Sequence, residues 1–343
     1  MAEPRLNTTH KIKATSEQLD QMLSHYQGYL TYNTSEYTIA RAKLSHATIT
    51  FYKTNVVLFQ GEKEAEEYNI WAKLFNLPLE EVTEHNKVNY ANLSAVGSDE
   101  VGTGDYFGPI VVCATYVNTE QIESLKRLGV KDSKLLTDKQ IINLALKLSE
   151  ILPYSIMFLE PKRLNNLSKA KSNFNYLKSY LHNKVITSIL KKIKNVKCDA
   201  ILIDEFTPKD KYFEYLENEE NIIKDVIMIP KGESAHLAIA AASILARYTF
   251  LREINKMNNE YSFNFLKGAG SEVDRTAISF VKAYGWDKLS EVAKLKFANT
   301  QRIKEYFINN PLPKSKQGTI NNKKGMIWEF NRHIIPFFNF DQQ

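Results

Sequence analysis

SDEVGTGDYFGPIVVCATYV, residues 98–117, places two adjacent acids and a glycine-rich turn directly before the most apolar segment of the chain. The run Ile110–Val117 is typical of a buried strand. Residues 95–99, on the other side of the turn, form a second candidate strand that ends at Asp99. Acids in this position point to a functional site, because open sheets build their sites beyond the ends of strands.

The pattern after residue 93 differs from the pattern before it. Strands come first and then alternate with helices, which predicts an α/β domain over residues 94–307, a mixed sheet flanked by helices. The expected strands are 95–99, 110–117, 154–160, 200–203 and 226–229, and the expected helices are 119–128, 138–150, 173–193, 210–219, 234–256, 276–283 and 289–297.

Residues 1–80 predict a separate, small α+β domain, and residues 81–93 a linker. Residues 308–343 form a C-terminal extension to which the sequence assigns no role. The small domain has the expected order strand, helix, three strands and helix, with strands at 10–13, 37–43, 47–51 and 56–60, a helix at 16–26 with Ser16 as candidate cap, and a helix at 62–76.

The composition of the 343 residues is that of a folded protein, with 43% hydrophobic and 24% charged residues. A formal net charge of +6 is compatible with a polyanionic partner, but a Lys-rich surface explains it equally well. Two cysteines make no disulfide framework, no apolar run of about 18 residues indicates a membrane span, and the N-terminus lacks a signal-peptide pattern. We therefore expect a cytoplasmic protein without a membrane partner.

Three acids share one kind of position. Asp99, Asp204 and Glu233 each lie at or just beyond the end of an expected buried strand. A single acid there is usually a solvated loop residue, and Glu233 is equally well explained as a first-turn acid favoured by the helix dipole. If the strands are neighbours, however, the carboxylates converge, and divalent cations between them would offset their repulsion. Oxygen ligands without His or Cys fit Mg²⁺ or Mn²⁺, and two such ions are a known device for phosphodiester hydrolysis.

Glu100, directly after Asp99, needs a further explanation. Neighbours in a regular strand point to opposite faces, so both acids serve one site only if the backbone twists or bulges there. Gly102 and Gly104 would permit such a distortion and would let backbone amides approach a phosphate.

Other polar features carry less weight. The Gly-Thr-Gly of residues 102–104 is a weak dinucleotide signal, because the third glycine and the acidic ribose partner are missing. The charged turn 131–134 is interpreted as a solvated loop, His236 as a packed or hydrogen-bonded histidine, and Arg247 as a surface or packing residue.

Five blocks in order carry a family resemblance: DEVGTGDYFGP at 99–109, GVKDSK at 129–134, LIDEF at 202–206, KGESAHLAIAAASILAR at 231–247 and KGAGSEVD at 267–274. Through these blocks the chain resembles ribonuclease HIII, the type 2 ribonuclease H group with an additional N-terminal domain. The order of elements in residues 10–76 is similar to that family's N-terminal domain, which resembles one half of the TATA-box-binding protein.

The resemblance implies a ribonuclease H-like fold and an endoribonuclease that hydrolyses the RNA strand of RNA/DNA hybrids, leaving 5′-phosphate and 3′-hydroxyl ends. It implies two bound Mg²⁺ or Mn²⁺ ions, with Glu100 at one of them and near the substrate's 2′-hydroxyl. The acids that match the family's catalytic and metal-binding set are Asp99, Glu100, Asp204 and Glu233.

The resemblance also implies which residues touch the hybrid. The N-terminal domain would bind it, with basic residues facing phosphates. In the catalytic domain a loop and a turn become candidate substrate contacts. The residues concerned are Lys11, Lys13, Arg41 and Lys43 in the first domain, and Gly102, Thr103, Gly104, Ser133 and Lys134 in the second.

Thr103 separates two nuclease hypotheses. The related ribonuclease HII has Gly-Arg-Gly at this place and uses it to recognise a single ribonucleotide at an RNA–DNA junction, so the threonine favours ribonuclease HIII. Ribonuclease HII-like cleavage at single ribonucleotides embedded in DNA stays an alternative, as does a catalytically silent hybrid-binding protein. A nucleotide-binding oxidoreductase is disfavoured by the missing fingerprint. We expect a monomer without an obligatory protein partner.

Overall fold

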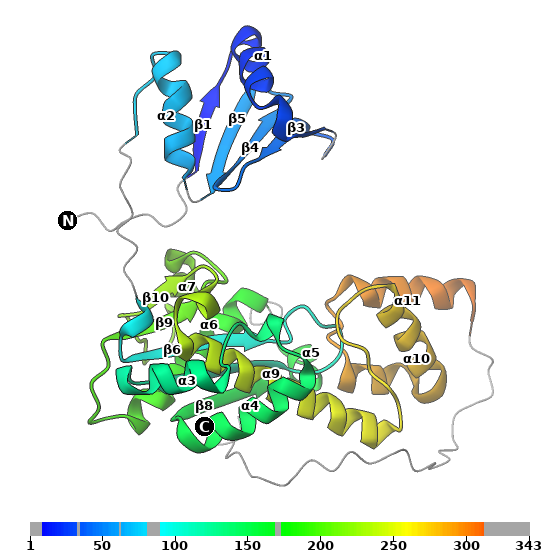
Figure 1. The fold of residues 1–343 in the computed structure, drawn as a ribbon. Helices are drawn as coiled ribbons and strands as arrows, with labels where there is room; N and C mark the ends of the chain where they lie inside the picture. The colour runs from blue at the N-terminus through cyan, green and yellow to red at the C-terminus, as the bar shows by residue number, and fades with distance from the viewer. Residues whose placement is uncertain (1–8, 33–34, 62, 81–89, 169–172, 312–343) are drawn as a thin grey trace. The chain divides into compact units, whose positions relative to one another are not determined.

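The computed structural model describes residues 9–32, 35–61, 63–80, 90–168 and 173–311. The chain divides into two compact units, residues 1–88 and 89–343 (Figure 1). Each unit combines one sheet with helices, which confirms the expected α/β class with a small α+β unit at the N-terminus. Within the described ranges no helix is long and apolar enough to span a membrane. The extension expected over 308–343 falls outside the described residues from 312 onwards.

The first unit is an antiparallel sheet of five strands in the order β1-β5-β4-β3-β2. The sequence analysis missed β2, because three residues at a sheet edge carry no alternating pattern of their own. Thr15, and not Ser16, caps the first helix, since its side chain accepts a hydrogen bond from the Gln18 amide. The elements are β1 (His10–Lys13), α1 (Ser16–His25), β2 (Leu30–Tyr32), β3 (Thr38–Lys43), β4 (Ala47–Tyr52), β5 (Val56–Gly61) and α2 (Glu64–Leu74).

The second unit is built on a mixed sheet in the order β10-β9-β6-β7-β8. The central strand β6 pairs antiparallel with β7 and parallel with β9, as expected for a mixed sheet. All eight residues of β7 are buried, because helices cover both faces of the sheet. The strands are β6 (Ala95–Val101), β7 (Ile110–Val117), β8 (Tyr154–Leu159), β9 (Ala200–Asp204) and β10 (Ile227–Ile229).

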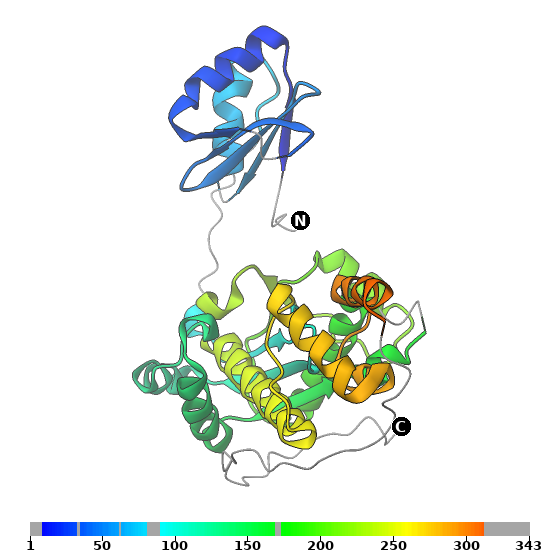
Figure 2. The same ribbon diagram turned by 90° about the vertical axis from the view of Figure 1, so that its right-hand side faces the viewer.

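Helices pack on this sheet from two sides (Figures 1 and 2). Helix α9 lies along β6 and β7 with α4 beside it, while α6 and α7 cover the opposite face. The pair α10 and α11 follows at the end of the described chain. The helices are α3 (Ile122–Leu128), α4 (Asp138–Ile151), α5 (Pro161–Asn165), α6 (Phe174–Lys192), α7 (Lys209–Leu216), α8 (Gly232–Ala235), α9 (Leu237–Tyr261), α10 (Ser271–Val292) and α11 (Ala298–Asn309).

Two helical predictions were wrong in detail. The single helix expected over 234–256 is divided at His236, whose extended backbone ends α8 and whose Nδ1 caps α9 by accepting a hydrogen bond from the Ala238 amide. The helix expected over 276–283 lies within α10, which is broken by the non-helical backbone of Gly285 (φ +83°); the helix expected over 289–297 is helical only to Val292, and α11 begins at Ala298.

Candidate active site

The sheet order brings three of the predicted acids to one edge. Ser98 of β6 is in register with Ile203 of β9. The next residue of each strand, Asp99 and Asp204, therefore lies toward the carboxyl end of its strand, and the two strands are adjacent and parallel. Asp204 is in turn in register with Ile229, the last residue of β10. Glu233 comes four residues later, in α8. The side chains therefore meet beyond the strand ends, where open sheets place their sites.

Asp99 and Glu100 serve the site from opposite faces of the sheet. Pairing of β6 with β7 runs unbroken from Ala95 to Val101, so of the twist or bulge that a shared site was expected to need, no bulge is present. Regular alternation directs Asp99 toward Ser243 of α9 and Glu100 toward His182 of α6. No distortion is needed, because at the end of the strand both carboxylates lie at the same edge.

Asp99 lies in a buried position beside other acids. Its side chain is buried, and burial, followed by the charges of Glu100 and Asp204, raises the pKa of Asp99 well above its usual range. A hydrogen bond from Ser243 acts in the opposite direction but does not outweigh these effects. Repulsion between converging carboxylates is the condition that a bound cation relieves.

Glu100 is held by two residues that the sequence analysis did not identify. His182 Nε2 lies 3.0 Å from Glu100 Oε2, and Lys178 Nζ lies 3.1 Å from Oε1. Burial alone would raise the pKa of Glu100, but the hydrogen bond and charge of His182 and the charge of Lys178 bring it below its usual value. In the sequence these residues are a Lys and a His four positions apart on one helix, beside its apolar positions. This spacing predicts that the two side chains share a helix face, but it does not identify the acid that they contact.

Glu233 is held by the turn that contains Ser133 and Lys134. The Ser133 amide donates to Glu233 Oε2 (2.7 Å), and Lys134 Nζ donates to Oε1 (3.0 Å). Asp132 shapes the turn by accepting a hydrogen bond from the Lys134 amide. The hydrogen bond to Glu233 raises the pKa of Lys134. Ser133 is buried and bound to Glu233, whereas Lys131 and Lys134 are exposed, so the interpretation as a solvated loop fits the lysines but not Ser133.

The donor chemistry of the four acids fits a hard divalent cation, because all their ligand atoms are carboxylate oxygens. Asp204 accepts the Gly232 amide on Oδ1 at 2.6 Å, which leaves Oδ2 for a cation. Glu100 and Glu233 have both oxygens engaged by protein donors. Among the described residues, accordingly, no three His, Cys, Asp or Glu side chains are already arranged around a metal position.

The glycine loop after β6 joins the site to its neighbourhood. Gly102 has φ +94°, and a Cβ there would lie 2.1 Å from the carbonyl oxygen of Pro109, so the turn requires glycine. Gly104 is exposed and has no heavy atom within 4 Å of an added Cβ, so its backbone is open to a ligand. Asp105 fixes the loop from below by accepting the Gly268 amide at 2.5 Å.

Lys294 supports the same loop from inside the protein. It is fully buried, and its Nζ donates to the carbonyl oxygens of Phe107 (3.2 Å) and Gly108. Burial lowers the pKa of Lys294 to about 7, although the charge of Asp105 acts in the opposite direction. In the unfolded chain a lysine titrates at about 10.4.

This difference predicts a pH-dependent stability. Between the two pKa values the unfolded chain binds a proton that the native chain does not, so the stability rises with pH. Between about pH 7.5 and about pH 9.5, we expect the free energy of unfolding of the wild type to rise with pH relative to that of Lys294→Met. The difference should grow by on the order of 1 kcal/mol per pH unit. Urea titrations at several pH values measure this, and parallel curves for the two proteins would contradict it.

Arg247 braces the turn that holds Glu233. Its guanidinium donates to the carbonyl oxygens of Ser133 and Leu136 (3.2 Å for the latter) and to Asp138 Oδ1 at 2.8 Å. Lys267 binds the other oxygen of Asp138 at 2.7 Å. The interpretation of Arg247 as a surface or packing residue therefore misses its contact with the site.

We expect Arg247→Met to slow cleavage of the substrate proposed below by about tenfold, because a small displacement of a positioned group is costly in rate. The measurement is the single-turnover cleavage rate. Arg275→Met is the matched control, since Arg275 is exposed and pairs with Glu272 within one helix. Equal rates for the two variants would show that the brace is dispensable.

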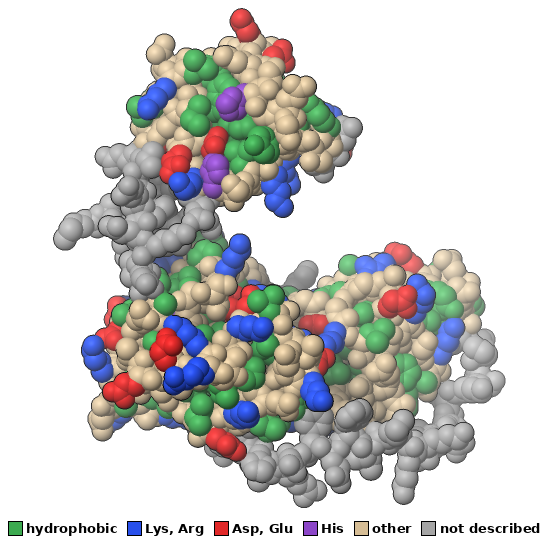
Figure 3. Space-filling view, in the orientation of Figure 1, with side chains coloured by type: hydrophobic (Ala, Val, Ile, Leu, Met, Phe, Trp, Pro, Cys, Tyr) green, Lys and Arg blue, Asp and Glu red, His purple; other side chains and the backbone are tan. Residues whose placement is uncertain are grey.

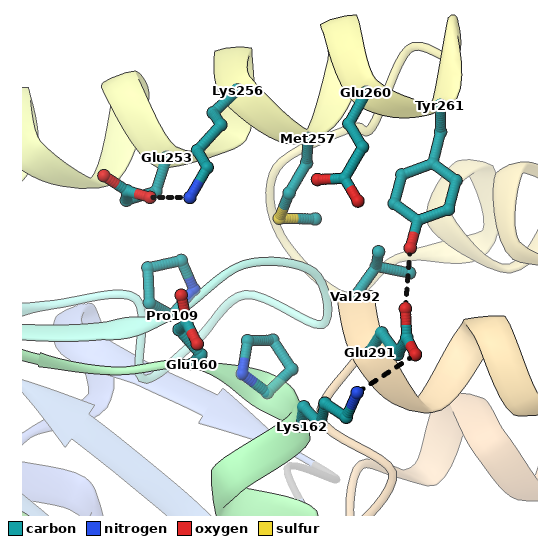
Figure 4. A pocket seen from close by; sticks show the side chains of 11 residues that line it. Pro109, Glu160, Lys162, Glu253, Lys256, Met257, Glu260, Tyr261, Glu291 and Val292 are labelled. Carbon is teal, nitrogen blue, oxygen red and sulfur yellow. Dashed lines mark hydrogen bonds and ion pairs between the residues drawn. The ribbon is translucent and has the colours of Figure 1, made fainter. Parts of the chain in front are cut away.

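A separate pocket contains none of the predicted site residues (Figure 4). Glu291 of α10 accepts hydrogen bonds there from Lys162 of α5 (3.2 Å) and Tyr261 of α9 (2.9 Å). Hydrogen bonds from Lys288, Tyr261 and Lys162 lower the pKa of Glu291 to about 2, against the opposing effect of burial. These contacts tie three helices together.

A mixed sheet with helices on both faces and four acids at its strand ends fits the type 2 ribonuclease H class that the sequence blocks resemble. Comparison with known proteins agrees: residues 96–300 match the family model described as ribonuclease HII. Residues 9–83 match a domain of unknown function (DUF3378). The chain is thus a ribonuclease H hydrolase.

Within this class the chain belongs to the ribonuclease HIII family. It is 40% identical over 302 residues to ribonuclease HIII of Enterococcus faecalis, covering 86% of this chain and 98% of that protein. It is 41% identical over 301 residues to ribonuclease HIII of Bacillus pumilus, with the same coverage of 86% and 98%. The crystal structure of Bst-RNase HIII in complex with Mn²⁺ is similar, with a TM-score of 0.62, 36% identity and coverage of 87% of this chain and 99% of that one.

Proposed function

We propose that the chain hydrolyses the RNA strand of RNA/DNA hybrids at a site where Asp99, Glu100, Asp204 and Glu233 hold two Mg²⁺ or Mn²⁺ ions, and that it leaves 5′-phosphate and 3′-hydroxyl ends. The observation that carries the proposal is the convergence of acids at one edge of the sheet, where Asp99 and Asp204 lie on adjacent parallel strands and burial with the charges of Glu100 and Asp204 raises the pKa of Asp99. The complex of the related Bst-RNase HIII with Mn²⁺ supports a divalent ion as cofactor.

When bound, such ions activate a water and stabilise charge on the oxygens of the phosphate. The residues of the chain hold and orient the reacting groups. Asp99 and Asp204 offer oxygens from adjacent strands, and Glu233 is kept beside them by the turn of Ser133. No side chain of the site is needed as a nucleophile in this reaction.

Two segments beside the acids suit contact with the sugar-phosphate backbone. Residues Gly102, Thr103 and Gly104 follow β6, and the exposed Gly104 leaves room for a close approach. The Lys134 side chain is 77% exposed although its ammonium group binds Glu233, so it can turn toward a phosphate, and Ser133 lies next to it. We assign these five residues to substrate binding.

The first unit presents basic residues on one face of its sheet. Alternation puts Ile12 and Ala42 in the core with the helices, whereas Lys11, Lys13, Arg41 and Lys43 point to the other face and are exposed. Lys11, Leu58, Thr50 and Arg41 form one row across four strands. On the face of the larger unit shown in Figure 3, basic and acidic side chains are interspersed. The basic face of the small sheet is therefore a better indication of a nucleic-acid contact than the net charge of the chain. We propose that this sheet face binds the hybrid.

Replacing Arg41 and Lys43 together by glutamine should weaken binding of the hybrid. It should also reduce the magnitude of the slope of log affinity against log salt by about 1 to 2, because fewer counterions are released from the nucleic acid when phosphate contacts are lost. Fluorescence anisotropy with a labelled hybrid at several salt concentrations measures the slope. Lys73→Gln, an exposed position on helix α2, is the control and should leave the slope unchanged. An unchanged slope for the double variant would argue against this face.

The substrate is tested by offering a labelled RNA/DNA hybrid and a DNA duplex with one embedded ribonucleotide, each with Mg²⁺, Mn²⁺ or a chelator. We expect metal-dependent cleavage of the hybrid, and slower cleavage at the single ribonucleotide because Thr103 replaces the arginine of ribonuclease HII. Faster cleavage at the single ribonucleotide would favour the ribonuclease HII-like alternative. Binding of the hybrid without metal-dependent cleavage of either substrate would favour a silent binding protein.

A further inference from the structure

Helix α6 occupies both oxygens of one candidate metal ligand. His182 reaches Glu100 Oε2 at 3.0 Å and Lys178 reaches Oε1 at 3.1 Å. The His182 side chain is completely buried, and that of Lys178 is 11% exposed. The two residues are one helical turn apart, so one face of the helix makes both contacts.

The His182 ring is fixed by what surrounds it. The Ser98 hydroxyl donates to the Cys113 carbonyl oxygen (2.9 Å), and Ser98 Oγ lies 2.7 Å from His182 Nδ1. The other ring nitrogen, Nε2, faces Glu100. The ring also stacks on Phe206, with centroids 5.1 Å apart and an interplanar angle of 15°. Three contacts thus determine where Glu100 Oε2 is held.

Lys178 is held less firmly. Its ammonium group contacts Glu100 Oε1 and lies 4.3 Å from the centroid of the Phe206 ring. The group stands at the end of a flexible four-carbon stem, so it can withdraw at the cost of one ion pair and one cation–π contact. Phe206 follows Asp204 by two residues, so the segment after β9 supplies both a candidate ligand and the ring that supports this pair.

We infer that His182 is a positioning residue that fixes one oxygen of Glu100, and that Lys178 is an internal counterion that occupies the other oxygen until a divalent cation displaces it. The inference rests on the proposed function, since it assumes that Glu100 binds a metal ion. A dication and an ammonium group cannot share one carboxylate oxygen at contact distance without strong repulsion. While Lys178 is in place, its ammonium charge opposes a dication at Glu100 Oε1.

The two residues therefore have opposite effects on metal affinity. Removing the charge of Lys178 frees Oε1 and removes a competitor, so a divalent ion binds more tightly. Removing His182 leaves Glu100 without its anchor, and loss of such a supporting partner weakens metal binding by about 10- to 100-fold. A purely structural role for the pair would not produce opposite signs.

The test is calorimetric titration of the full-length protein with Mn²⁺ alone, without nucleic acid. We expect Lys178→Met to bind Mn²⁺ at least about tenfold more tightly than the wild type. His182→Leu should bind it at least about tenfold more weakly, and His182→Gln, whose amide can still donate to Glu100, should recover part of the loss. The matched control is Lys184→Met, since Lys184 lies on the same helix, pairs with Glu219 at 3.5 Å and lies over an aromatic ring, Tyr180. This control should bind Mn²⁺ like the wild type.

Asp99→Asn separates the two ways in which this account can fail. If the wild type binds Mn²⁺ no better than Asp99→Asn, the metal site itself is wrong, and the proposed function falls together with this inference. If Asp99→Asn loses binding but Lys178→Met binds Mn²⁺ equally or more weakly than the wild type, only the inference is overturned. Circular dichroism confirms that each variant is folded, and Lys178→Gln replaces Lys178→Met in the same comparison if the latter does not fold.

Discussion

Asp99→Asn should reduce cleavage of an RNA/DNA hybrid by at least about 1,000-fold, because loss of a proposed ligand of the catalytic ions would remove several kcal/mol of transition-state stabilisation. The same substitution should stabilise the folded chain. Burial and the charges of Glu100 and Asp204 raise the pKa of Asp99, so the ionised side chain is unfavourable in the native state at neutral pH. A neutral asparagine removes that repulsion, and the free energy of unfolding should rise by on the order of 1 kcal/mol.

The single-turnover cleavage rate and a urea titration on the same preparation measure both effects. Asp210→Asn is the control, because Asp210 is an exposed acid in the first turn of α7. It should leave cleavage and stability unchanged. An Asp99→Asn protein that cleaves the hybrid at a rate near that of the wild type would remove Asp99 from the catalytic set.

Gly97→Ala should have the largest effect on stability. A Cβ at Gly97 in β6 would lie 2.3 Å from the Ile239 amide nitrogen and 2.4 Å from the carbonyl carbon of Ala238, both backbone atoms at the start of α9. The helix cannot retreat freely, because the Thr115 hydroxyl of β7 donates to the Ala238 carbonyl oxygen at 2.7 Å. Overpacking against backbone in a dense core should cost about 3 kcal/mol or more.

Denaturant unfolding followed by circular dichroism measures this loss. Gly104→Ala is the control in the same unit, since an added Cβ there meets no heavy atom within 4 Å. It should leave the unfolding midpoint unchanged, although it adds a methyl group to the proposed substrate loop. Equal midpoints for Gly97→Ala and the wild type would mean that α9 does not approach β6 as closely as described.

The sequence predicted the parts of the site that depend on order along the chain. The run that ends at Asp204 and the glycine-rich turn after Glu100 are local features, and alternation of strands with helices implies a sheet that gathers strand ends at one edge. The hydrogen-bond partners of the acids could not be predicted in this way. Glu100 and His182 are 82 positions apart, and Ser133 and Glu233 are 100 apart, so only the packing of α6 and of the 131–134 turn brings them together.

The errors in local structure have similar causes. Nothing in the alanine-rich run that contains His236 marks the break between α8 and α9, because the residue that ends one helix caps the next through its own side chain. The bulge expected at Glu100 was unnecessary, since helices on both faces supply partners to side chains that point in opposite directions. In each case the deciding interaction is tertiary.

The central claim, that four acids at the strand ends hold catalytic divalent ions, is tested most directly by anomalous diffraction at the manganese absorption edge from crystals of the protein grown with Mn²⁺ and a hybrid. The account predicts two anomalous peaks, bounded by the carboxylates of Asp99, Glu100, Asp204 and Glu233. Mn²⁺ peaks only elsewhere, or none in the presence of bound hybrid, would contradict it.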